Sequence, residues 1–187
     1  MDSLKDIQSS LDTKRIYVGN EIFRFVLGEP AQDNNILVIG VNPSKADDKQ
    51  DDPTIRNVRK FVKSTHFIDG WIMVNPYPLR NSDPRELPSE CDNALVEYNI
   101  KIINEIIQKF NVKYVWAGWG SGIEEKEYLW KCLYRLIQSI PSSLKWFSRP
   151  GLSMNGNVIH PYYPRGEVKL VDFDIISHLK NKGIYSE

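Results

Sequence analysis

The stretch LVIGVNPSKADDKQDDPTIRN, residues 37–57, carries the pattern that decides the fold. It continues an apolar run that begins at Ile36 and ends at Gly40. Short continuous apolar runs are typical of strands buried on both faces of a parallel sheet. Asp52 followed by Pro53 indicates a helix start, because aspartate caps free backbone N–H groups and proline suits the first helical position. The stretch therefore predicts a buried strand, a polar loop and a helix.

Apolar runs of the same kind recur further along the chain. GWIMVN (70–75) and VKYVWAGWG (112–120) predict two more buried strands. NVIHP (157–161) is a shorter candidate for a fourth strand, and LKWFS (144–148) is a candidate strand near it. Strands that alternate with helices are typical of a parallel sheet joined by right-handed crossovers.

Hairpin and helix patterns occupy the remaining segments. KRIYVGNEIFRFVL (14–27) alternates around Gly19 and Asn20, which predicts an N-terminal β-hairpin. Apolar residues at helical spacing predict three further helices, over 93–110, 124–140 and 172–183. The expected fold class is α/β. It is a three-layer sandwich with a central, mainly parallel four-stranded sheet plus the hairpin, in a single domain over 1–187.

Composition limits the classes of partner. The 187 residues include 24 Lys and Arg against 24 Asp and Glu, so the formal net charge is zero. Nucleic-acid binders usually carry a basic excess that neutralises phosphates. A nucleic-acid site here must rely on a local basic patch, or the substrate is small. The two cysteines exclude a four-cysteine zinc or iron–sulfur site, and we expect no metal and no cofactor.

The chain has no pattern typical of a membrane protein. Its first residues, MDSLKDIQSSLD, are polar, and no apolar run approaches the roughly 20 residues that span a bilayer. We therefore expect a cytoplasmic protein with reduced thiols.

Polar and aromatic residues follow each predicted strand. The four segments concerned are GVNPSKAD (40–47), NPYPLRN (75–81), GWGSG (118–122) and HPYYPRG (160–166). Ligands of parallel α/β sheets bind at the carboxyl ends of the strands. The sequence therefore predicts a polar cleft lined by rings at that edge of the sheet.

The ordered set GVNPS, MVNPYPL, WAGWGSG and HPYYP resembles the uracil-DNA glycosylase superfamily. More narrowly, the Asn-Pro-Ser, Asp-Pro-Thr and His-Pro-x-Tyr blocks are similar to those of an uncharacterised bacterial and phage domain family. The resemblance extends from Ile36 to Pro164. It implies a DNA glycosylase-like protein that flips a nucleotide out of DNA and hydrolyses its N-glycosidic bond. DNA or another nucleobase-containing molecule is then the partner.

The resemblance also assigns roles to individual positions. Asn42 matches the residue that activates or orients water, and Asn75 matches the one that reads the edge of the base. His160 matches the histidine that donates to the base oxygen, in the manner of an oxyanion hole. Tyr162 and Tyr163 lie where the family inserts a wedge into the base stack.

Further residues complete the predicted site. An amide such as that of Asn42 cannot act as a base, so a carboxylate is needed. Asp47 is the preferred catalytic base, because Asp52 is accounted for as a helix cap. Ser44 and Tyr77 are predicted to contact the base, and Lys45 and Arg165 to contact DNA.

Two alternatives to a DNA glycosylase stay open. Without a strong base, the same fold could serve as a non-catalytic nucleobase, nucleotide or single-strand binding protein. Zero net charge also agrees with hydrolysis of a free nucleoside or nucleotide. Asn42 itself can be explained as a turn residue before Pro43.

Overall fold

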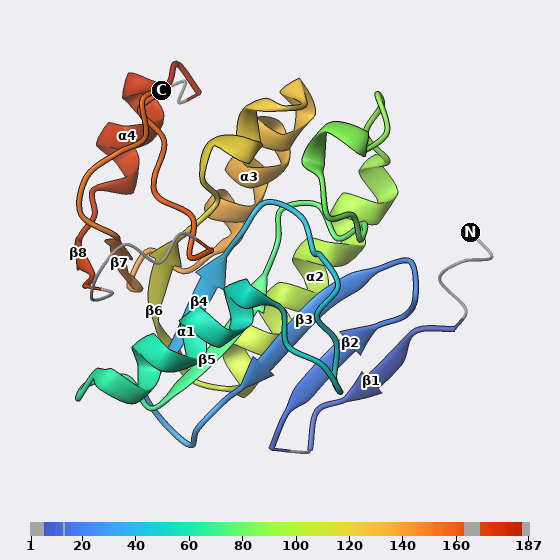
Figure 1. The fold of residues 1–187 in the computed structure, drawn as a ribbon, viewed down its shortest axis with the longest axis vertical. Coiled ribbons are helices and arrows are strands. Elements are labelled where there is room, and N and C mark those ends of the chain that lie inside the picture. Colours follow the sequence, from blue (N-terminus) through green and yellow to red (C-terminus); the bar gives the residue numbers. More distant parts are fainter. Residues whose placement is uncertain (1–5, 13, 163–168, 185–187) are drawn as a thin grey trace.

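The computed structural model describes residues 6–12, 14–162 and 169–184. It contains a mixed sheet with the strand order β1-β2-β3-β5-β4-β6-β7-β8 (Figure 1). The strands are β1 (Gln8–Ser10), β2 (Ile16–Gly19), β3 (Arg24–Glu29), β4 (Asn35–Ile39), β5 (Gly70–Val74), β6 (Val112–Ala117), β7 (Lys145–Ser148) and β8 (Val171–Asp172). Pairing is parallel between β5 and β4, between β4 and β6 and between β6 and β7. The other pairings are antiparallel.

Helices cover both faces of this sheet. They are α1 (Pro53–Ser64), α2 (Asn93–Lys109), α3 (Glu127–Ser139) and α4 (Ile175–Asn181), with short 3₁₀ helices η2 (Pro84–Glu86) and η3 (Ser121–Glu124). Figure 1 shows α1 in front of the sheet and α2 behind it. In β4, Leu37 packs in the core cluster of α2 and α3, whereas Val38 packs in the cluster of α1. Successive strand side chains point to opposite faces, so β4 is buried on both.

The α/β class expected from the sequence is confirmed, but the sheet is larger and more mixed than expected. It has eight strands, and antiparallel strands extend both of its sides. The hairpin of β2 and β3 turns at Asn20, whose Oδ1 accepts the N–H groups of Ile22 and Phe23. The edge strands β1 and β8 are short and largely exposed, so they leave no apolar pattern in the sequence.

The predicted start of α1 is confirmed, whereas the predicted strand at 157–161 is wrong. Asp52 Oδ1 accepts the Ile55 N–H at 2.9 Å, and Pro53 is the first residue of the helix. The strand that pairs in parallel with β6 is β7, not 157–161. The side chain of Asn157 donates to Glu124 and its carbonyl accepts from Ser153. These bonds keep the segment in a loop.

Two further findings concern membranes and metals. In the ranges given above, the structure has no helix that is long and apolar enough to cross a membrane. The same ranges contain no group of three or more His, Cys, Asp or Glu side chains placed to hold a metal ion.

Candidate functional site

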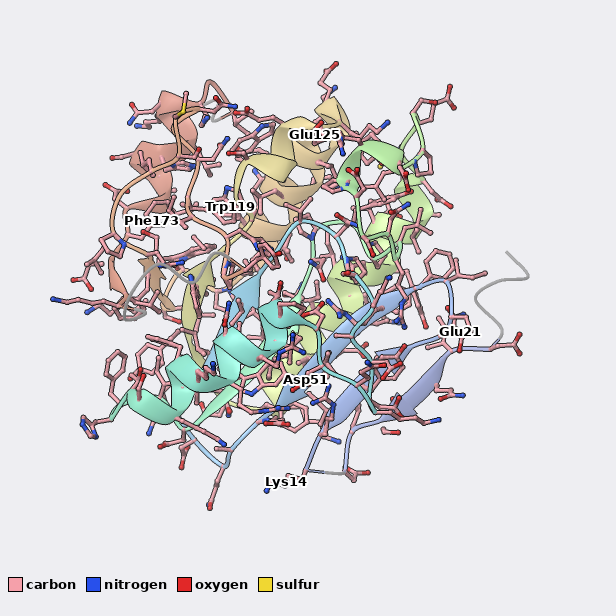
Figure 2. All side chains as sticks on the ribbon, viewed as in Figure 1. Lys14, Glu21, Asp51, Trp119, Glu125 and Phe173 are labelled. Atoms are coloured by element: carbon pink, nitrogen blue, oxygen red, sulfur yellow. The ribbon has the colours of Figure 1, made fainter. Side chains whose placement is uncertain are left out.

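A cavity of about 470 Å³ opens at the carboxyl ends of the parallel strands. Its walls come from the segments after β4 and β6, from the first turn of α1 and from the segment 153–162. Trp119 lies at the cavity and packs against Phe173, with the ring centroids 6.3 Å apart, and against His178 of α4; Figure 2 labels Trp119 and Phe173. The cleft predicted from the strand ends is therefore present as a cavity.

Asp52 brings a carboxylate to this cavity. One of its oxygens caps α1, and its other oxygen has no hydrogen-bond partner among the described residues. The negative charge of Asp52 favours the protonated form of both His160 and Arg24. These three ionisable groups therefore interact electrostatically within one cavity.

His160 supplies a neutral hydrogen-bond donor. Its Nδ1 accepts the backbone N–H of Tyr162 at 3.1 Å, so in the neutral ring the proton lies on Nε2. Burial of the imidazole lowers the pKa of His160 to about 4, and the charge of Asp52 only partly opposes this. At neutral pH the ring is uncharged and Nε2–H is a donor.

His160 also predicts a specific pH dependence of stability. Its pKa is about 4 in the folded chain and 6.5 as the ordinary value, so between these limits the unfolded chain binds more protons. The free energy of unfolding should therefore fall as pH drops from 6.5 toward 4, by up to about 1.4 kcal/mol per pH unit. Denaturant unfolding of the wild type and of His160→Gln measures this, and the variant should show a shallower slope. Equal slopes would contradict a His160 that is neutral in the folded chain. His178 is present in both proteins, so its contribution to the slope is the same in each.

A glycine fixes the position of His160. Gly120 has a φ of +65°, and a Cβ added there would lie 2.8 Å from the Cβ of His160. Only a residue without a side chain permits this approach. The GWGSG segment (118–122) therefore contributes to the site through the left-handed backbone of Gly120, which leaves room for His160.

Asn42 lines the cavity with an amide whose orientation is fixed. Its Nδ2 donates to the carbonyl of Asn81 at 2.7 Å. The amide oxygen then remains as an acceptor for a water or a ligand N–H. Ser44 also lines the cavity, and its hydroxyl lies 3.3 Å from that of Ser82.

Arg24 is a cavity residue that the sequence reading missed. Its side chain, on β3, donates to the carbonyl of Ala46 at 3.0 Å and to Asn75 Oδ1 at 3.4 Å. Arg24 is only 2% exposed, and burial lowers its pKa to about 10, with the charge of Asp52 opposing. It remains a cation at neutral pH. A charged residue between Phe23 and Phe25 was the signal in the sequence that could have revealed it.

Three arginines hold the loop between β4 and α1. Three consecutive backbone carbonyls, at residues 45–47, accept from Arg80 at 2.9 Å, Arg24 at 3.0 Å and Arg15 at 3.1 Å, respectively. Hydrogen bonds to charged donors are stronger than neutral ones. The loop that carries Asn42 and Ser44 is therefore fixed before any ligand arrives.

Asp47, the preferred base, does not line the cavity. Its Oδ1 accepts the backbone N–H groups of Lys49 and Gln50, both at 2.8 Å, in a local turn. The preference for Asp47 over Asp52 as the carboxylate of the site is therefore reversed. Asp52 caps the helix and also faces the cavity, because the first turn of α1 forms part of its wall.

Two predicted base-contacting residues lie in the interior instead of at the cavity wall. Asn75 is 1% exposed and lies behind Gly40, where an added Cβ would meet its Nδ2 at 2.7 Å. Tyr77 packs its ring against Tyr128 in the core, with the ring centroids 5.2 Å apart. Neither residue contacts a cavity ligand in this arrangement.

The residues predicted to contact DNA have mixed outcomes. Tyr162 lines the cavity and is 49% exposed. Lys45 lies outside the cavity, in a neighbouring hollow. Tyr163 and Arg165 lie outside the described residues.

Comparison with known proteins gives one match. The model of a family described as "Protein of unknown function (DUF1643)" matches residues 24–162. These limits coincide with Arg24 and Tyr162, the first and last residues of the cavity wall in chain order. Searches of curated proteins and of solved structures found no match.

Proposed function

The chain belongs to the DUF1643 family, and we propose that it binds a nucleobase-containing ligand in the cavity and hydrolyses its N-glycosidic bond. One observation carries the proposal: the carboxylate of Asp52 and the neutral imidazole of His160 meet in the same cavity. This pairing of a negative group and a neutral donor suits a bond that breaks with charge separation.

The proposed reaction uses the two groups on opposite sides of that bond. As the bond between the sugar C1′ and the base nitrogen breaks, its electron pair leaves with the base. His160 Nε2–H donates to the base, where negative charge develops. Asp52 faces the sugar, where positive charge develops, and takes a proton from the water that adds to C1′. The Asn42 amide oxygen orients that water or accepts a base N–H.

The volume and the rings of the cavity support a nucleobase as the ligand. Small-molecule pockets commonly measure roughly 300–1,000 Å³, and this cavity measures about 470 Å³. Tyr162 borders it and is 49% exposed, so its ring offers a flat surface on which a base can stack. In DNA the base would have to leave the helical stack to enter.

The order of the four motifs along the chain supports a likeness to the uracil-DNA glycosylase superfamily, although the motif that contains His160 follows a loop and not a strand. Asn42 and His160 lie at the cavity, as that likeness requires. A central set of parallel strands, β5-β4-β6-β7, agrees with the finer fold that we propose. Asn75 and Tyr77 depart from the likeness, so the base would be read by other groups, of which Arg24 is one.

The test is a substrate panel. The full chain is incubated with single-stranded and duplex oligonucleotides that contain uracil, hypoxanthine, a thymine mismatch or hypermodified phage bases, and with the corresponding free nucleosides. Release of a free base from any of them is the expected result. No release across the panel would remove the enzymatic claim.

A non-catalytic binder is the second candidate function. The specific observation in its favour is that Asp52 already accepts a backbone N–H and lies in the field of the cationic Arg24. A carboxylate that already caps α1 has a structural role of its own, and a binding protein needs no catalytic base. Binding of the panel ligands without turnover, lost in His160→Ala, would establish the binder.

A further inference from the structure

A second hollow, of about 330 Å³, adjoins the cavity. Its wall consists of Ser44, Lys45, Arg80, Asn81 and Ser82. Three of these residues, Ser44, Asn81 and Ser82, also line the main cavity. The two hollows therefore meet at these polar side chains, and one ligand can occupy both.

The hollow presents hydrogen-bond donors and positive charge. Lys45 is exposed, and its ammonium group has no hydrogen bond or ion pair among the described residues. The hydroxyls of Ser44 and Ser82 lie 3.3 Å apart, so both can turn toward one ligand oxygen. Ammonium, guanidinium and hydroxyl donors together are the groups that bind phosphate oxygens.

Arg80 is positioned by the protein and not neutralised by it. Its NH1 donates to Tyr17 Oη at 3.1 Å and to the Asn20 carbonyl at 3.2 Å. Its NH2 donates to the carbonyl of Lys45 at 2.9 Å. These acceptors carry no formal charge, and no carboxylate in the described chain pairs with Arg80. The guanidinium is thus fixed and keeps its positive charge.

The neighbouring carboxylates do not cancel this charge. Asp83, next to Ser82, is paired with Arg85 in a bidentate arrangement. Asp47 uses its carboxylate on backbone N–H groups, although the charge of Arg80 helps to lower its pKa. Two cations, Lys45 and Arg80, line the hollow, and no carboxylate is among its lining residues, so the hollow keeps a positive balance.

We propose that this hollow, termed the phosphate subsite (Ser44, Lys45, Arg80, Asn81 and Ser82), binds a phosphate group attached to the sugar of the ligand whose base occupies the cavity. This proposal rests on the proposed function for the identity of the rest of the ligand. It makes the substrate a nucleotide, free or within a strand, and not a nucleoside. It also explains how a chain with no net charge could bind a phosphorylated ligand.

Binding measurements test the subsite with matched variants. Calorimetry compares a deoxynucleoside with its 3′- and 5′-monophosphates and with a dinucleotide, for the wild type, Lys45→Gln, Ser82→Ala and Lys49→Gln. Lys49 is an exposed lysine on the same loop but outside the hollow, so Lys49→Gln is the control. The wild type should bind a phosphorylated form more tightly, and Lys45→Gln should reduce that advantage about tenfold. Lys49→Gln should leave the advantage unchanged.

The different ligands distinguish a free nucleotide from a nucleic-acid strand as the source of the phosphate. They also distinguish failure of the phosphate subsite from failure of the proposed base binding. A preference for a monophosphate indicates a free nucleotide, and one found only with the dinucleotide indicates a strand. Equal affinity for nucleoside and nucleotides, or equal losses in Lys45→Gln and Lys49→Gln, would overturn the subsite while leaving base binding in place. If no nucleoside binds, titration with inorganic phosphate still tests whether the phosphate subsite exists. Shifts of the Lys45 and Ser82 amide resonances, reduced in Lys45→Gln, would support the subsite without the proposed function, and their absence would overturn it.

Discussion

Asp52→Asn is expected to lower the rate of glycosidic hydrolysis about 100- to 10,000-fold, with little change in stability. The substitution removes the negative charge and the proton acceptor but keeps the size of the side chain. An asparagine also caps a helix nearly as well as an aspartate, so its Oδ1 can retain the bond to the Ile55 N–H. Single-turnover rates and thermal melts of the two proteins measure both effects.

Asp92→Asn is the matched control for this variant. Asp92 caps α2 in the same way, accepting the Leu95 N–H at 3.0 Å, but it is not a cavity residue. We expect Asp92→Asn to keep full activity and similar stability. A small effect of Asp52→Asn on the rate, no larger than that of Asp92→Asn, would exclude Asp52 as the catalytic carboxylate.

Gly120→Ala is expected to reduce activity about 100-fold, because an error of about 1 Å in the placement of a reacting group has an effect of that size. The new methyl group would lie 2.8 Å from the Cβ of His160 and force this residue to move. The left-handed backbone adds a cost in stability of about 1–2 kcal/mol. Enzyme kinetics and denaturant unfolding measure the two effects separately.

Gly183→Ala isolates the backbone cost. Gly183 has a φ of +66°, almost the same as that of Gly120, but an added Cβ there has no neighbour within 4 Å. This variant should lose comparable stability and no activity. If both variants lost activity to the same extent, strain and not displacement of His160 would be responsible.

Local sequence patterns predicted the elements well, because their signals lie within a few residues of each other. The apolar run before Gly40 predicted β4, and the Asp52-Pro53 pair predicted the start of α1. The edge strands were not predicted, whereas the candidate strand at 144–148 is confirmed as β7, which takes the place beside β6 that 157–161 was expected to share. Short polar edge strands have no apolar face to reveal them, and 157–161 has the composition of a strand but a loop's hydrogen bonds.

The site was predicted in outline and corrected in detail. Parallel strands place their carboxyl ends together, so Asn42, which follows β4, could be assigned to a cleft from the sequence, and it lines the cavity. His160 also lines the cavity, but it does so from a loop and not from the end of the strand predicted at 157–161. Asn75 also follows a strand, but its side chain turns into the interior toward Arg24. Which way a side chain points at a strand end depends on twist and neighbouring packing, and the local sequence does not contain that information.

The sequence by itself determined the α/β class, the loop and helix that follow β4, and the edge of the sheet at which polar groups gather. Only the tertiary structure decided that Asp52, and not Asp47, faces the cavity and that the buried Arg24 lines it. It also decided that Lys45 and Arg80, 35 residues apart, share one hollow. The physical reason is the separation in sequence over which each interaction acts. Propensities and caps act between neighbours in the chain, whereas a cavity is formed by segments that meet only when the sheet assembles.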